Sequence, residues 1–231
     1  MTMTSFRDSR PDPAEVLRPA YEAFGALLQA LDEEQSWAPT GCTGWSVRDL
    51  AFHCLGDAQR GLVALHTPAD GEPDRDAVTY WSDWGGQSEE AAARGRLAIR
   101  AAGSMFPAFA TLRDRCLATA AAVLHAAGRS DGQQRVATQG HVLRTDDLLR
   151  TLAVEATVHH LDLTVSLPGM PAPSPEGLAE VRRTLDGLLG RPVPVTWDDA
   201  HYARAGTGRA PLTGAERAAL GADAARFPLF S

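Results

Sequence analysis

The stretch TDDLLRTLAVEATVHHLDLTVSL, at residues 145–167, is the part of the sequence that says most about the fold. Its apolar residues recur at the spacing of an amphipathic α-helix. Thr145 or Asp146 can serve as the N-cap, so the pattern predicts a helix from about Asp147 to Leu167. A long helix with an apolar face indicates a mainly α protein whose helices pack around a shared core.

One face of this helix combines leucine with acidic and histidine side chains. On a wheel of about 100° per residue, Glu155, His159 and Asp162 fall within roughly 60° of Leu148. Glu155 and Asp162 are therefore predicted to lie in the interior. The opposite arc is predicted to face solvent, and it holds Arg150, Thr157, His160 and Thr164.

A carboxylate buried among leucines costs several kcal/mol unless it has a partner. Glu155 and His159 are four residues apart, so their side chains lie next to each other on the helix and can bind one divalent cation. The alternative is a structural hydrogen bond between the two side chains, without a metal.

Two ligands are too few for a protein metal site, so a third is expected from a neighbouring helix. Ser46 and Asp49 form a capping pattern for a second helix, and His53 lies at the edge of the apolar stripe of that helix. A histidine in such a position can also be a plain hydrogen-bonded core residue. The other candidates fall in or near loops or helix ends and are weaker: His66, His125, His141 and His201.

The rest of the chain divides into further helices and connections. Helices are expected over residues 13–31, after Ser46 as far as Leu62, over 88–127 with a break near Pro107, and over 175–189. Residues 66–87 are predicted to form a long loop that carries Tyr80, Trp81 and Trp84, and residues 133–143 a connection without helical pattern.

The proline-rich run LPGMPAPSP, at residues 167–175, is predicted to separate two parts of the chain. Residues 1–167 would form a helical bundle, and residues 168–231 a small C-terminal α(+β) extension. In this extension PVPVTW, at residues 192–197, is expected to be a strand or an extended arm, and the tail an irregular segment with one short helix.

Composition excludes several classes of protein. A net charge of −7 and a pI near 5.5 argue against a nucleic acid or an anionic membrane as partner. No apolar run approaches the roughly 18 residues of a membrane span, and residues 1–13 lack the apolar middle of a signal peptide, so a cytoplasmic location is expected. The cysteines Cys42, Cys54 and Cys116 show no zinc-finger spacing, and they are expected to be free and to pack in the interior.

Two segments resemble a known family. GWSVRDLAFH, which ends at His53, is similar to the GW-[ST]-V-x-D-L-x-x-H segment of the mycothiol-dependent maleylpyruvate isomerase family, part of the DinB-like four-helix-bundle superfamily. VEATVHHLDLTV, at residues 154–165, resembles the second motif of that family, E-x-x-x-H-x-x-D-[LM]. The resemblance implies a DinB-like bundle in which His53, Glu155 and His159 bind zinc or another divalent ion. The absence of lysine, which leaves arginine for all 22 basic residues, suits a GC-rich actinobacterial genome and hence a mycothiol-producing organism.

The resemblance also implies a reaction. Two histidines and one glutamate are the ligand set of a catalytic zinc with an open position, where mycothiol could bind as a thiolate and attack a small electrophile, with isomerisation or S-transfer as the result. Asp162 could orient the imidazole of His159, and Arg209 could bind an anionic group of the thiol or substrate, although a solvated loop arginine is the plainer interpretation. Two alternatives stay open: a metal-dependent hydrolase, or a non-catalytic metal-binding protein of DinB-like fold.

Overall fold

The computed structural model describes residues 11–83 and 88–230, so Trp84 lies outside the described residues. Two strands, β1 (Arg135–Thr138) and β2 (His141–Arg144), form an antiparallel hairpin in which Val136 faces Leu143. The helices are α1 (Pro13–Ala30), α2 (Val47–Leu65), α3 (Glu89–Gly103), α4 (Phe109–Ala127), α5 (Thr145–Leu163), α6 (Pro175–Leu189), α7 (Asp199–Gly206) and α8 (Gly214–Leu220).

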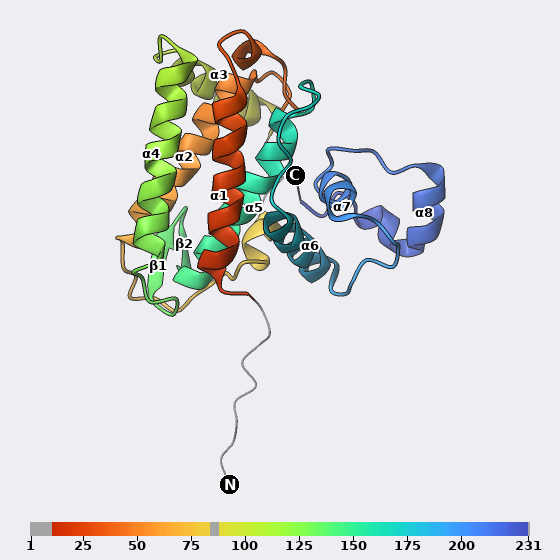
Figure 1. Cartoon of the computed structure of the whole chain (residues 1–231). Helices are drawn as coiled ribbons and strands as arrows, with labels where there is room; N and C mark the ends of the chain where they lie inside the picture. Colours follow the sequence, from red (N-terminus) through yellow and green to blue (C-terminus); the bar gives the residue numbers. More distant parts are fainter. Residues whose placement is uncertain (1–10, 84–87, 231) are drawn as a thin grey trace.

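Four of these helices form the bundle that the sequence predicted (Figure 1). Helix α2 packs against α4 and α5, and α1 packs against α5 and α4, which closes a ring of four. The core between them consists of aliphatic side chains that are fully buried, among them Leu17, Leu50, Leu112, Leu148 and Leu152. The prediction of a mainly α fold with a small C-terminal extension is confirmed.

The capping pattern at the start of α2 is also confirmed. The Ser46 hydroxyl accepts a hydrogen bond from the backbone N–H of Asp49, and the Asp49 carboxylate accepts one from the backbone N–H of Ser46. The predicted caps of α5 are wrong, because Arg144 is the N-cap and Thr145 is already helical. The backbone N–H of Thr145 donates instead to the carbonyl of Gln134, since the hairpin leads directly into the helix.

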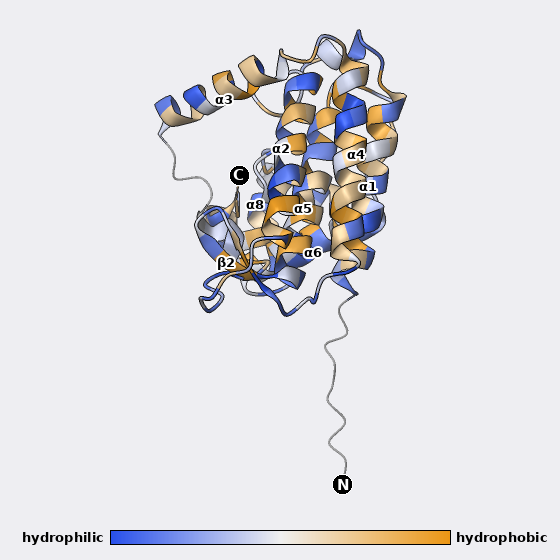
Figure 2. Cartoon of the chain, turned by 90° about the vertical axis from the view of Figure 1, so that its left-hand side faces the viewer, coloured by the Kyte–Doolittle hydropathy of each residue, from blue (hydrophilic) through white to orange (hydrophobic). Residues whose placement is uncertain are grey.

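The region from α3 to the hairpin agrees with the sequence prediction in its helices but not in residues 133–143. The long helical region breaks into α3 and α4 on either side of Pro107, as predicted. Residues 133–143, however, contain most of the β-hairpin, whose Val136 and Leu143 side chains are both fully buried. Helix α3 extends away from the bundle, and Gly103 at its end is its one buried residue (Figure 2).

Helix α6 covers the face of α5 that the wheel assigned to solvent, so the prediction for Arg150, Thr157 and His160 is wrong. Arg150 donates a hydrogen bond to the Glu180 carboxylate of α6 at 2.9 Å, with both side chains buried. Nε2 of His160 lies 2.8 Å from the carbonyl oxygen of Pro171. Polar residues are tolerated on this face because each of these side chains has a partner there.

The C-terminal segment packs onto the bundle through α6 and α7. Val154 and Val158 of α5 share a hydrophobic cluster with Leu185 of α6 and Tyr202 of α7. Residues 192–197 contain no strand, and the tail after Gly206 contains one α-helix, α8, as expected. Within the described part of the chain, no helix combines the length and hydrophobicity that crossing a bilayer requires.

Candidate metal centre

The polar side chains of α2 and α5 meet in the interface between these two helices. One donor atom from each of His53, Asp57, Glu155 and His159 lies within 4.8 Å of all the others. The rings of His53 and His159 meet edge to face, with centroids 4.9 Å apart. The structure therefore brings together the three residues that the sequence singled out, and adds Asp57.

Glu155 and His159 form a close pair on α5. Oε2 of Glu155 lies 3.3 Å from Nε2 of His159, and both side chains are about nine-tenths buried. Burial by itself would raise the pKa of Glu155, but the adjacent His159 holds it below its usual value. Glu155 therefore has a partner even without a metal, so its burial alone is a weaker argument for an ion than the sequence suggested.

Asp57 is the member of the cluster that the sequence analysis did not select. Its Oδ1 accepts a hydrogen bond of 3.1 Å from Arg60, while its buried Oδ2 lies 3.2 Å from Nε2 of His53 without hydrogen-bond geometry to any described residue. Burial and the nearby Glu155 raise the pKa of Asp57, because a second negative charge is unfavourable here. Its position four residues after His53 was a signal that could have identified it.

Burial favours the neutral form of His53. Desolvation lowers the pKa of His53, whose ring also packs on the indole of Trp45 with centroids 5.1 Å apart. A metal ligand must be a neutral imidazole, so this environment suits ligation.

Asp162 and Arg209 lie on the far side of His159. Oδ2 of Asp162 is 3.0 Å from Nδ1 of His159, and Nε of Arg209 donates to both oxygens of Asp162 at 2.8 and 3.0 Å. Burial opposes ionisation of Asp162, but these two partners lower its pKa to about 2. Arg209 is thus held by a carboxylate inside the site, and its guanidinium lines the adjacent cavity.

Cys42 lies beside the same carboxylate. Its Sγ is 3.3 Å from Oδ2 of Asp162 and 3.9 Å from Nδ1 of His159. The loop that carries Cys42 is held close to α5 because Gly41 donates its backbone N–H to the carbonyl of Asp162. Only glycine fits at position 41, since a Cβ there would lie 2.5 Å from Oδ1 of Asp162. The three cysteines are free, but Cys42 is part of the site and not merely a core residue.

A cavity of about 170 Å³ opens over the cluster. Its far wall is aromatic, since Trp81 packs against Phe230 with ring centroids 4.5 Å apart. The C-terminal segment therefore contributes part of the wall. The residues that line this aromatic pocket are Trp45, His53, Trp81, Glu155, Val158, His159, Arg209 and Phe230.

The weaker histidine candidates lie elsewhere. Nδ1 of His141 is 2.8 Å from Asp74, and Nε2 of His201 is 2.6 Å from Glu216, both at the surface of the molecule. His66 and His125 are exposed. None of the four belongs to the His and carboxylate groups that could hold a metal among the described residues.

The fold and the site together define a helical-bundle protein with an interior cluster of imidazole and carboxylate groups. A family model described as the mycothiol maleylpyruvate isomerase N-terminal domain matches residues 17–164. The chain belongs to this family. No curated protein and no solved structure matches it.

The donor set fits a divalent ion. Two imidazole nitrogens and two carboxylate oxygens are ligands that zinc and other first-row divalent metals accept. The second oxygen of Asp57, buried without a hydrogen bond among the described residues, is the kind of atom that a bound cation would satisfy.

Proposed function

We propose that the protein is a divalent-metal enzyme that uses a low-molecular-weight thiol, mycothiol, either to isomerise a small electrophilic substrate or to form a thiol adduct with it by S-transfer. His53, Glu155 and His159 would hold the ion, with Asp57 as a further oxygen donor. The observation that carries the proposal is the convergence of these donor atoms within 4.8 Å in the interior of the bundle. Membership of a mycothiol-related family supports the choice of thiol.

The charges of the cluster favour an anionic co-ligand. Three carboxylates, those of Asp57, Glu155 and Asp162, face the guanidinium groups of Arg60 and Arg209, which leaves one net negative charge when both imidazoles are neutral. With a divalent ion bound, the same cluster carries one net positive charge. A thiolate would balance it, whereas a neutral thiol would not.

The residues of the chain have separate tasks in this scheme. Asp162 accepts a hydrogen bond from the Nδ1–H group of His159, which leaves the Nε2 lone pair of that ring for the cluster. Arg209 holds Asp162 in the ionised form that this hydrogen bond needs. Trp45 and Trp81 form walls that keep bulk water from the thiol and the electrophile.

A bound divalent ion lowers the pKa of a coordinated thiol, so that the thiolate nucleophile is present at neutral pH. Addition of this thiolate to a cis double bond, rotation about the resulting single bond and departure of the thiolate would give the trans isomer. If the carbanion left by the addition takes up a proton from solvent before the thiolate departs, the thiol stays attached and the same addition is an S-transfer.

Metal content is the first test. The purified protein should contain close to one equivalent of zinc or a similar ion by elemental analysis. Glu155→Ala should fold, as judged by far-UV circular dichroism, but lose the ion, because an apolar side chain removes a ligand and a buried charge together. The exposed Glu22 gives a matched control, and Glu22→Ala should keep the ion. Full metal retention in Glu155→Ala would contradict the assignment.

Thiol binding is the second test. In the cobalt(II)-substituted protein, mycothiol should produce a thiolate-to-metal charge-transfer band and release a proton. An equal response to cysteine or glutathione would argue against mycothiol as the specific thiol. No response to any thiol, together with hydrolysis that needs no thiol, would favour a hydrolase. Metal binding without either activity would favour a non-catalytic protein.

A further inference from the structure

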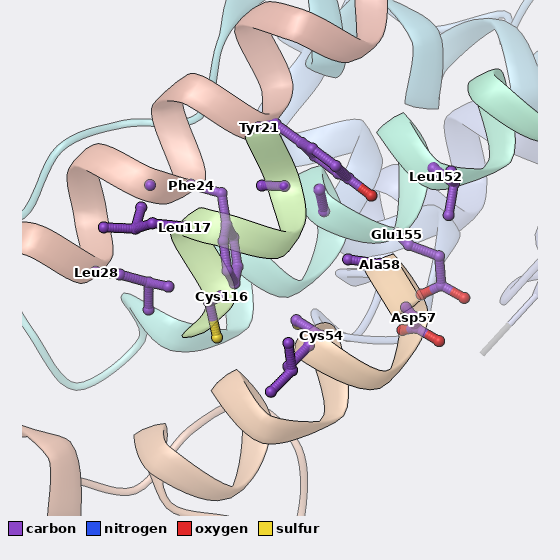
Figure 3. A pocket seen from close by; sticks show the side chains of 14 residues that line it. Tyr21, Phe24, Leu28, Cys54, Asp57, Ala58, Cys116, Leu117, Leu152 and Glu155 are labelled. Carbon is purple, nitrogen blue, oxygen red and sulfur yellow. The ribbon is translucent and has the colours of Figure 1, made fainter. Parts of the chain in front are cut away.

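Two spaces border the metal cluster, and they differ in size. Glu155 lines both of them. The inner cavity, among helices α1, α2, α4 and α5, has the carboxylates of Asp57 and Glu155 at one end (Figure 3), and its volume of about 40 Å³ suits water and not a substrate. The aromatic pocket measures about 170 Å³, and a protein cavity of about 150 Å³ holds a molecule of benzene. A substrate that reaches the cluster therefore binds in the aromatic pocket, which has room for one six-membered ring.

Three aromatic side chains are held in place around this pocket. Trp81 and Phe230 are only 3 % and 7 % exposed, and the planes of their rings lie within 31° of each other. The indole of Trp45 packs on the ring of His53 and donates its Nε1–H to the carbonyl of Arg96 in α3 at 3.3 Å. Because these contacts fix the rings before a ligand arrives, a flat aromatic group can pack against them at little cost in side-chain entropy.

The pocket has little positive charge to offer a substrate. Arg209 is the one permanent cation among the described residues that line it, and its Nε and Nη1 already donate to Asp162 and to the carbonyl of Thr207. A cluster with a divalent ion carries one net positive charge, which the thiolate balances. A carboxylate on the substrate would then lie near Glu155 without a cation of its own. The charges therefore favour an uncharged substrate.

We infer that the substrate is an uncharged electrophile with one aromatic ring, an aryl-substituted enone, whose ring packs against Trp45, Trp81 and Phe230. The inference rests on the proposed function, to which it adds a substrate class. In the reaction, the thiolate sulfur forms a bond to the β-carbon, and the electron pair of the carbon–carbon double bond moves toward the carbonyl oxygen to give an enolate. Rotation and expulsion of the thiolate give the trans enone, whereas uptake of a proton from solvent at the α-carbon gives the thiol adduct.

Binding is tested with three unreactive compounds by ligand-observed NMR titration, on the full chain as purified and with its metal content measured. 4-Phenylbutan-2-one carries the ring and an uncharged carbonyl, pentan-2-one has a methyl group in place of the ring, and 3-phenylpropanoate has a carboxylate in place of the ketone. Mycothiol is present, so that it occupies the open position of a bound ion. The aryl ketone should bind at least about tenfold more tightly than either of the other two compounds.

A substitution in the pocket checks the location. Phe230→Leu keeps an apolar side chain but removes the aromatic face, so it should weaken binding of 4-phenylbutan-2-one about two- to tenfold and leave pentan-2-one unchanged. Phe106 packs against Phe52 and does not line the pocket, so Phe106→Leu is the control and should bind both ketones as the unmodified chain does. Far-UV circular dichroism checks that both variants fold.

Three results would overturn the inference: equal affinity for pentan-2-one and the aryl ketone, tighter binding of 3-phenylpropanoate than of the aryl ketone, or unchanged binding of the aryl ketone by Phe230→Leu. Failure of the proposed function gives a different pattern. A chain that takes up no metal but binds the aryl ketone through Phe230 would contradict the metal chemistry and leave the preference for an aromatic ligand standing. A chain that binds metal and mycothiol but not the aryl ketone would overturn the substrate class alone.

Discussion

Asp57 of α2 and Glu155 of α5 belong to one cluster, yet their electrostatic situations differ. Glu155 has His159 as a partner at 3.3 Å, and its pKa is lowered. Only one oxygen of Asp57 accepts a hydrogen bond from Arg60, and burial and the nearby Glu155 raise the pKa of Asp57. The least satisfied negative group in the cluster is therefore Asp57, and it should respond most directly to a bound cation.

We expect Asp57→Asn to weaken metal binding about 10- to 100-fold, the range seen when a polar group at a metal site is lost. The amide keeps the shape of the side chain but removes its charge, so the bundle should remain folded. Competition titration with a chelator measures the affinity. Asp114→Asn, at an exposed position of α4, is the control and should bind metal as the unmodified chain does. Unchanged affinity in Asp57→Asn would show that this carboxylate does not contribute.

At the scale of elements, the crossing of α5 by α6 depends on a small residue. A Cβ added to Gly177 would lie 2.3 Å from Oγ1 of Thr157, closer than any real contact allows. The two helices can therefore approach only where α6 has no side chain. This contact, together with the buried Arg150–Glu180 pair, explains why polar residues of α5 lie in the interior.

Gly177→Ala should lower the free energy of unfolding by about 1–3 kcal/mol, because the methyl group forces α6 away from α5. The change is measured by urea unfolding. Gly95 of α3 is the matched control, since a Cβ there would meet nothing within 4 Å. Gly95→Ala should be neutral or stabilising by up to about 1 kcal/mol, because alanine is the better helix former. Equal destabilisation by both substitutions would refute the close approach as the cause.

At the scale of the whole molecule, Arg209 links the C-terminal segment to the ligand-bearing helix. Its guanidinium lies on the loop after α7, and its partner Asp162 lies at the end of α5 beside His159. Phe230 packs on Trp81 at the aromatic pocket, so the C-terminal segment contacts the site twice. We propose residues 168–231 as a separate extension of the bundle, but Arg209 and Phe230 of this extension form part of the candidate metal site and its pocket.

The Arg209–Asp162 pair should make stability depend on pH. The pKa of Asp162 is lowered from 3.8 to about 2 in the folded chain, so the stabilisation is present above pH 3.8 and is lost as the pH falls toward 2. A shift of this size corresponds to about 2 kcal/mol at neutral pH. Part of this stabilisation comes from the hydrogen bond to His159, so Arg209→Gln should remove only a fraction of the roughly 2 kcal/mol.

We expect the difference in unfolding free energy between the unmodified chain and Arg209→Gln to be constant from pH 7 to 5 and to shrink as the pH falls below 4. Urea unfolding at a series of pH values measures it. Arg217→Gln, at an exposed position of α8, should show no such dependence. A difference that stays constant down to pH 3 would mean that Arg209 stabilises the chain by packing and not by its charge.

Local patterns in the sequence determined the helices and the pair at the centre of the site. The spacing of apolar residues predicted the four bundle helices, and Ser46 with Asp49 predicted the start of α2. The four-residue spacing of Glu155 and His159 placed both on one face of α5 before any fold was known. These features depend on neighbours along the chain, through helical periodicity and capping, and so they can be identified without tertiary contacts.

The tertiary structure alone decided which element covers each face and which atoms remain without partners. Periodicity identified the arc of α5 with Arg150, Thr157 and His160, but could not reveal that α6 buries it. It likewise could not show that Arg209 reaches Asp162 or that Cys42 lies beside His159. Each of these contacts joins residues far apart in the chain or depends on how two helices are rotated against each other. Such rotations are set by the packing of the whole core, which no local pattern encodes.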